Sequence, residues 1–333
     1  MNFTLIICTY MRPNPLLKLL ESVKHQSLYP NEIIIVDGST NLDTKIILEQ
    51  NYFEKLNYFL VEKENRGLTK QRNFGISKTS GQSEIVCFLD DDTILEPNYF
   101  EEISKTYVAY PNALGVGGYI NNEVIWTKTT DNYTPARNEF FFDGWKRKDG
   151  SRFVLRKKLG LDSDTKPGFL PEFSNGRSIG FLPPSGKIYE VEQLMGGVSS
   201  FKKVVFNQFQ FSTYFEGYGL YEDADFTLRL SKTGKLYVNT KAQLDHFHDH
   251  SGRPNKYQYG KMVVRNGWYV WRVKYPKPSF KSILKWNIII LLLTFTRFSN
   301  IFTTSKRKEA FTESIGRTIG WFSLFFNKPK IST

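Results

Sequence analysis

The sequence Ile85-Val86-Cys87-Phe88-Leu89-Asp90-Asp91-Asp92 decides the fold. Five apolar residues in a row are long enough for a strand and too short for an amphipathic helix. An unbroken run of this kind is typical of a strand that is covered on both faces of a parallel sheet. Three carboxylates follow where that strand ends. Because ligands of open α/β sheets bind outside the carboxyl ends of the strands, this edge is the predicted site.

Three adjacent aspartates repel one another, which predicts a cation among them. Hard oxygen ligands favour Mg²⁺ or Mn²⁺, and such an ion keeps coordination positions for phosphate oxygens. Aspartate is also common in acidic loops and at helix N-termini, so the triplet alone leaves those interpretations open. Its position directly after a buried strand favours the metal–phosphate interpretation.

Earlier runs repeat the pattern. Strands are predicted at Phe3–Cys8, Glu32–Val36 and Tyr58–Val61, and helical stretches alternate with them. Such alternation predicts an α/β fold with a doubly wound, mainly parallel sheet and flanking helices. The same edge then collects polar residues that follow the first three strands, namely Thr9, Asp37 and Asn65.

Composition sets limits on the class of protein. The chain has 333 residues and a net charge of +12, a field that could attract nucleic acid, anionic lipid or nucleotide phosphates. Its two cysteines, Cys8 and Cys87, lie inside apolar strand-like runs, which favours reduced thiols and a cytoplasmic setting. No signal peptide is visible at the N-terminus.

The second half carries three further features. Gly196–Phe201 has the pattern of a tight turn into a strand, and the carboxylates Glu222 and Asp223 precede a predicted helix. Acidic residues also favour the first turn of any helix, so this pair has a purely structural interpretation too. His246, His248 and His250 then cluster after a predicted short strand at Leu236–Val238, and one of them could bind a metal.

In their order, these motifs resemble the family 2 glycosyltransferases, which have the GT-A fold. The resemblance covers roughly residues 1–250 and rests on Ile6–Tyr10 with Arg12, Val36–Ser39, Asn65–Gly67 with Arg72–Gly75, Phe88–Asp92, Gly196–Phe201, Glu222-Asp223 with Asp225 and Arg229, and His246. One departure is Gly38, where many relatives carry a second acidic residue. Asp37 alone would then serve the nucleotide base.

The resemblance implies an inverting, metal-dependent transfer of a hexose or deoxyhexose from a UDP- or dTDP-sugar. Asp223 would be the catalytic base, because an acceptor hydroxyl must lose its proton as the new bond forms. Asp92 and His246 would hold Mg²⁺ or Mn²⁺, with His248 as the alternative ligand. Glu222 and Gly197 would lie on the acceptor side. The donor-binding residues would be Thr9, Asp37, Asn65, Arg72, Asp90 and Asp91.

Two domains are expected. Residues 1–252 would form the catalytic domain, with a nucleotide-binding half at 1–118 and an acceptor-side half at 119–252, and residues 253–333 a basic, aromatic helical tail. The apolar run Ile288–Leu293 falls short of the ~20 residues that span a bilayer. We therefore expect an interfacial helix on the cytoplasmic face of a membrane. Packing on the domain, or a dimer interface, would explain the same residues.

Other classes of function are weighed against this one. A metal-dependent nucleotidyltransferase needs the same carboxylates but leaves Glu222-Asp223 without a role. A nucleic-acid-binding protein would use the basic, aromatic stretch Tyr257–Tyr275. A glycoside hydrolase needs no nucleotide site. The glycosyltransferase interpretation predicts a saccharide or lipid-linked saccharide acceptor, in surface polysaccharide synthesis, and no nucleic-acid partner.

Overall fold

The computed structural model describes residues 1–130, 132–247 and 254–331. The chain divides into two compact units. Unit 1 comprises Met1–Trp126 and Ile179–Gly252, and unit 2 comprises Thr127–Ser178 and Arg253–Thr333. Residues 127–178 and the C-terminal helices thus share a unit. The expected catalytic domain at 1–252 and helical tail at 253–333 stay a prediction.

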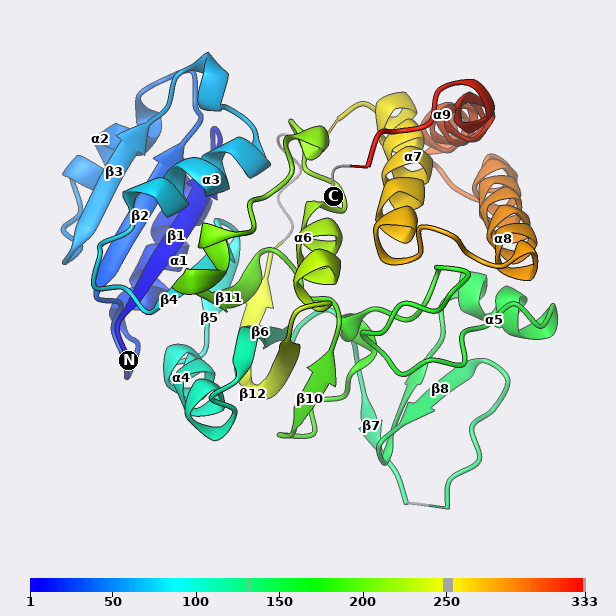
Figure 1. Ribbon diagram of the computed structural model, residues 1–333, viewed down its shortest axis with the longest axis horizontal. Coiled ribbons are helices and arrows are strands. Elements are labelled where there is room, and N and C mark those ends of the chain that lie inside the picture. Colours follow the sequence, from blue (N-terminus) through cyan, green and yellow to red (C-terminus); the bar gives the residue numbers. More distant parts are fainter. Residues whose placement is uncertain (131, 248–253, 332–333) are drawn as a thin grey trace. The chain divides into compact units, whose positions relative to one another are not determined.

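Four parallel strands form the N-terminal half of unit 1. They are β1 (Phe3–Thr9), β2 (Glu32–Asp37), β3 (Leu56–Leu60) and β4 (Ile85–Asp90), in the order β3-β2-β1-β4. Figure 1 shows β1, β2 and β3 side by side in blue, next to the helices that connect the strands. Those helices are α1 (Pro13–Lys24), α2 (Asp43–Glu49) and α3 (Leu68–Lys78). The predicted β/α alternation of this half is confirmed.

The sheet continues beyond β4 with mixed directions. Strand β11 (Val198–Lys202) runs antiparallel to both β4 and β6 (Ala113–Ile120), and β6 pairs in parallel with β12 (Lys235–His246). At the far edge, β10 (Ile188–Val191) and the short β5 (Thr93–Leu95) pair antiparallel with β12. Helices α4 (Tyr99–Ala109) and α6 (Glu222–Leu230) complete the unit. The predicted mixed, mainly parallel sheet is confirmed.

Strand register places the predicted polar residues at one edge. Thr9 lies opposite Asp37 on β2, and Cys8 lies opposite Asp90 on β4. The buried amide of Gln71 on α3 fixes this edge, because its nitrogen donates to the carbonyl oxygens of Thr9 at 3.0 Å and Val36 at 2.8 Å. A side chain from α3 thus adds two hydrogen bonds to the pairing that already joins the ends of β1 and β2.

The core explains why the strands formed where predicted. Successive residues of β1 and β2 are buried, namely Ile6 and Ile7 with Ile34 and Ile35, so both faces of these strands are covered. One strand was predicted wrongly. The short strand at Leu236–Val238 is the first part of the twelve-residue β12, which runs on to His246 through a register shift between Val238 and Gln243.

Unit 2 combines a small sheet with four helices. Strands β7 (Thr127–Lys128), β8 (Glu139–Phe142) and β9 (Trp145–Lys148) pair in the order β7-β9-β8. The helices are α5 (Ser151–Lys158), α7 (Lys256–Lys274), α8 (Phe280–Ser299) and α9 (Arg307–Phe326). The last three are coloured yellow, orange and red in Figure 1. The predicted C-terminal helical extension is confirmed.

Candidate active site

Three side chains at the sheet edge form a cluster that could hold a metal ion. Asp90 ends β4, Asp92 lies two residues later, and His246 ends β12. One ligand atom from each lies within 4.8 Å of the others. Two carboxylates and one imidazole leave coordination positions for phosphate oxygens, and the imidazole favours Mn²⁺ over Mg²⁺ relative to an all-oxygen set. The residues present therefore fit a divalent cation.

The middle aspartate of the triplet is turned inward. The hydroxyl of Thr9 donates to Asp91 Oδ2 at 2.6 Å, and Arg12 Nη1 donates to Asp91 Oδ1 at 3.0 Å. Burial raises the pKa of Asp91 to about 7, while the Arg12 guanidinium and the Thr9 hydroxyl oppose that shift. Arg12 also lies 3.4 Å from Asp92 Oδ2. Thr9 and Asp91, both predicted to bind the donor, thus contact each other, and Arg12 joins two of the three carboxylates.

His246 lies between two carboxylates. Its Nε2 is 3.0 Å from Asp92 Oδ1, and its Nδ1 is 3.3 Å from Glu123 Oε1. Burial lowers the pKa of His246, but the hydrogen bonds to Asp92 and Glu123 outweigh burial and raise it to about 10. Asn122 fixes the backbone, because its side chain pairs with both N–H and C=O of His246 at 3.0 Å. The ring orientation is therefore defined from both sides.

A pair of glycines lets charged groups approach the start of β11. A Cβ atom at Gly197 would lie 2.1 Å from Asp90 Oδ2, and one at Gly196 would lie 2.5 Å from Glu222 Oε1 and 2.6 Å from Arg72 Nη1. No side chain fits at either position without moving these groups. The glycine pair is thus the contact point between the aspartate triplet and the Glu222-Asp223 pair.

Arg72 is buried rather than open to solvent. It forms an ion pair with Glu222, lies 3.6 Å from Asp90 Oδ1, and its guanidinium is 5.6 Å and 5.2 Å from the ring centroids of Phe88 and Phe211. Burial lowers the pKa of Arg72, but the charges of Glu222 and Asp90 raise it above its ordinary value. Arg72 therefore stays cationic and links the two acidic parts of the site.

Asp223 lies at the N-terminus of α6. Its two carboxylate oxygens accept hydrogen bonds from the backbone N–H groups of Gly196 at 3.1 Å and Ala224 at 2.7 Å. Burial raises the pKa of Asp223, and these two backbone donors oppose the shift. A carboxylate with a raised pKa and a fixed orientation is suited to accept a proton.

Other predicted residues lie apart from this cluster. Asp37 is fully buried, and its oxygens accept from the Tyr58 hydroxyl and the Ser39 backbone N–H, both at 2.8 Å. Asn65 ends a 3₁₀ turn at Lys63–Asn65 and is exposed. His248, the alternative metal ligand, lies outside the described residues. Two residues of the site had no role predicted from the sequence, namely Arg12 and Glu123. Glu123 follows Asn121 and Asn122, which form no recognisable catalytic motif with it.

Comparison with known families decides the identity of the N-terminal part. Residues 4–165 match the sequence profile of glycosyl transferase family 2. These residues belong to glycosyl transferase family 2. The resemblance deduced from the motifs is therefore confirmed over this stretch, which contains β1 to β4 and the aspartate triplet.

Curated relatives match about a third of this chain. Glycosyltransferase GlyA of Streptococcus pneumoniae is 35% identical over 121 residues, which are 35% of this chain and 17% of that protein. Glucosyl-dolichyl phosphate glucuronosyltransferase of Haloferax volcanii is 30% identical over 125 residues, 36% of this chain and 38% of that protein. The matched stretches thus span well under half the length of these relatives.

A solved structure shares the fold of this chain. The crystal structure of Staphylococcus aureus TarS 1-349 superposes with a TM-score of 0.51 at 15% sequence identity, and the alignment covers 97% of this chain and 80% of that one. The likeness confirms the GT-A architecture. At this identity it carries no information about substrates.

Proposed function

We propose that this chain is an inverting glycosyltransferase that moves a sugar from a nucleoside-diphospho-sugar, with UDP or dTDP as the nucleotide, to a hydroxyl of a saccharide acceptor. One observation carries the proposal. Gly197 lies against Asp90 of the candidate metal cluster, while Gly196 lies against Glu222 and donates its backbone N–H to Asp223 at 3.1 Å. The candidate metal ligands that would serve the donor therefore lie next to Asp223 and Glu222, which would serve the acceptor.

Each group has a task in this reaction. A divalent cation bound by Asp90, Asp92 and His246 would stabilise the charge that develops on the leaving diphosphate. Glu123 and Arg12 orient the groups of that cluster. Asp223 accepts the proton of the attacking acceptor hydroxyl, and displacement by a single activated hydroxyl inverts the anomeric carbon. Arg72 pairs with Glu222 beside that base, and its charge opposes the rise that burial causes in the pKa of Glu222.

The name of one relative bears on the acceptor class. That relative is named for glucosyl-dolichyl phosphate, a lipid-linked sugar. We extend that chemistry to this chain and propose a saccharide acceptor, free or lipid-linked, in surface polysaccharide synthesis.

A thermal-shift screen tests the donor class. Nucleoside diphosphates, nucleotide sugars and nucleoside triphosphates are compared with and without Mn²⁺. A ligand at a hundred times its Kd stabilises the folded state by about 2.7 kcal/mol. The proposal expects a UDP- or dTDP-sugar with Mn²⁺ to give the largest rise in Tm, and expects Asp92→Ala to lose it. Stabilisation by triphosphates alone would favour a nucleotidyltransferase instead.

A further inference from the structure

Unit 2 exposes an unusually apolar surface on α8 and α9. Phe295 on α8 is 69% exposed, and Phe322 and Phe326 on α9 are 54% and 91% exposed. We call ten of the exposed apolar side chains of these two helices the apolar face: Leu284, Ile288, Leu291, Phe295 and Phe298 on α8, with Phe311, Ile319, Phe322, Phe325 and Phe326 on α9. Large exposed apolar patches of this kind mark interaction surfaces.

The two helices present this face together. Phe298 and Phe311 contact each other with ring centroids 6.5 Å apart. A groove of about 350 Å³ runs between the helices and is lined by residues of both, among them Leu291, Phe295 and Ile319. The residues on α8 recur at intervals of three or four positions, which places them along one side of the helix. The apolar face is therefore continuous across both helices.

The opposite sides of both helices are committed to packing inside unit 2. Trp286 of α8 stacks on Trp271 of α7 with ring centroids 5.1 Å apart, and Ser282 donates to Glu172 at 2.7 Å. On α9, a Cβ atom at Gly316 would lie 2.1 Å from the carbonyl oxygen of Tyr257 on α7. Neither helix can rotate its apolar side inward without breaking these contacts.

The charges around the apolar face indicate what binds to it. The segment after Ser279 carries only two acidic residues, and both are paired: Glu309 with Lys256, and Glu313 with Arg297 and Arg317. Basic residues lie at both ends of the apolar face, namely Lys281, Lys328 and Lys330 at one end and Lys306, Arg307 and Lys308 at the other. A second copy would bring like charges together, whereas an anionic surface would attract them.

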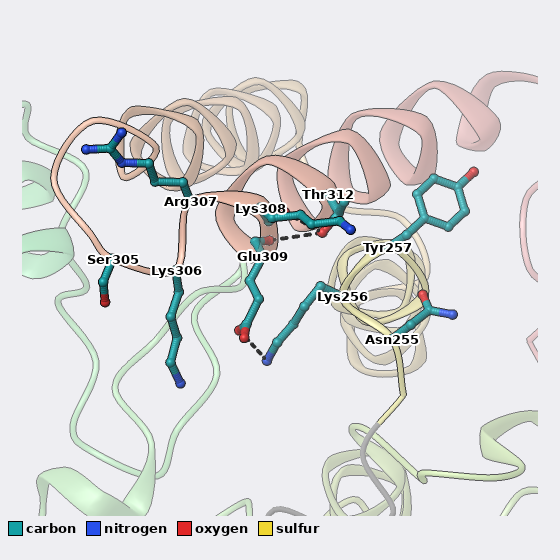
Figure 2. A pocket seen from close by; sticks show the side chains of 9 residues that line it. All are labelled: Asn255, Lys256, Tyr257, Ser305, Lys306, Arg307, Lys308, Glu309 and Thr312. Atoms are coloured by element: carbon teal, nitrogen blue, oxygen red, sulfur yellow. Dashed lines mark hydrogen bonds and ion pairs between the residues drawn. The ribbon is translucent and has the colours of Figure 1, made fainter.

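One basic end of the face forms a hollow. Figure 2 shows Lys306, Arg307 and Lys308 at the start of α9. Glu309 of α9 reaches Lys256 at the start of α7, 3.6 Å away. The hollow measures about 560 Å³. Cations that surround an open hollow beside an apolar face suit headgroup phosphates whose acyl chains contact that face.

By length and composition, Phe280–Thr303 is also a helix long and apolar enough to cross a membrane, which differs from the expectation drawn from the sequence. Its packed side argues for an in-plane position. A crossing helix would carry Lys285, Asn287 and Arg297 into the hydrocarbon, yet these groups bond within unit 2, where Asn287 accepts from Trp321 Nε1 at 2.8 Å.

We propose that the apolar face docks unit 2 on an anionic lipid bilayer, with α8 and α9 lying in the plane of the surface and the basic residues at its ends contacting headgroup phosphates. The proposal goes beyond glycosyl transfer, since it uses no residue of unit 1. It would hold the chain at the surface where lipid-linked saccharides are found.

Co-sedimentation of the full chain with phosphatidylcholine vesicles, with and without phosphatidylglycerol, tests the docking. The chain should pellet with the anionic vesicles and less so at high salt. Phe295→Glu with Phe322→Glu should lower partitioning by about tenfold or more. The matched control is Tyr52→Glu with Val108→Glu, which adds the same charge at two exposed apolar positions of unit 1, 81% and 74% exposed. It should bind as the unchanged chain does.

A second variant separates charge from apolar contact. Replacing Lys306, Arg307 and Lys308 by Ala should lower partitioning by about a hundredfold, because each basic residue near an anionic surface contributes about fivefold. Circular dichroism and Mn²⁺ binding verify that each variant is folded. The proposal is overturned if the face variant pellets like its control, or if the chain ignores anionic vesicles. Resistance to extraction at high pH would establish a crossing helix, and a dimer that the face variant dissociates would establish a second copy; either result also overturns it.

Discussion

Substituting Gly197 by Ala should weaken metal binding while leaving the fold intact. The new methyl group would lie 2.1 Å from Asp90 Oδ2, whereas real Cβ contacts essentially never fall under 3.0 Å. The backbone of Gly197 cannot retreat, because its carbonyl oxygen accepts from the Asp90 N–H at 3.1 Å and β11 pairs with β4 from the next residue. The Asp90 carboxylate must therefore move by about 0.9 Å.

That displacement is large for a metal ligand and small for the fold. Metal–ligand distances vary by only about 0.2 Å, so we expect the Mn²⁺ affinity to fall by about a hundredfold. The Asp90 side chain is 40% exposed and can turn toward solvent. The fold should lose less than about 1 kcal/mol, which lowers Tm by less than about 4 °C.

Titration calorimetry with Mn²⁺ and UDP measures the loss, and thermal unfolding measures the stability. Gly81→Ala is the matched control, since a Cβ atom there meets nothing within 4 Å. Asp90→Asn should reproduce the weaker binding without any steric conflict. Wild-type affinity in a folded Gly197→Ala protein would refute the inclusion of Asp90 in the ligand set.

Four further outcomes follow from the site. Asp92→Ala should abolish metal-dependent nucleotide binding in calorimetry, and unchanged affinity would remove Asp92 from the site. Asp223→Asn should keep Mn²⁺ and UDP binding but lower turnover by ~10²-fold or more, the scale of general-base loss; near-normal turnover would transfer that role to another carboxylate. Burial raises the pKa of Asp223 above its ordinary value of 3.8. As the pH is lowered, turnover should therefore begin to fall at a pH above 3.8, because the base becomes protonated. A rate that stays constant down to pH 3.8 would contradict this. Glu123→Gln should weaken Mn²⁺ binding by about 10- to 100-fold, as loss of a group that orients a ligand does, whereas the exposed Glu64→Gln should change nothing.

Much of the catalytic sheet could be predicted because its signals are local. The apolar run Ile85–Leu89 specifies a buried strand by its composition, and the residue after such a strand reaches the ligand edge whatever the rest of the fold is. The predicted turn at Gly196 and Gly197 leads into β11, as the structure shows. Features set by neighbours in sequence were therefore accessible.

Features set by distant neighbours were not. Arg12 meets Asp91 across 79 residues of chain, and Glu123 meets His246 across 123. Nothing adjacent to Glu123 distinguishes it from a loop carboxylate. Strand β12 was predicted too short because its polar stretch after Val238 resembles a loop, and the register shift there breaks the alternation that identifies a strand.

The charge balance of the site ties its parts together. In the described part of the chain, five carboxylates lie near Gly196 and Gly197 and the strand ends. They are Asp90, Asp91, Asp92, Glu222 and Asp223. Two guanidinium groups, Arg12 and Arg72, lie among them. Each arginine joins two of the carboxylates. Five carboxylates thus outnumber two guanidinium groups, which favours a further cation, and Asp90, Asp92 and His246 offer ligand atoms for it while phosphate oxygens can complete its coordination.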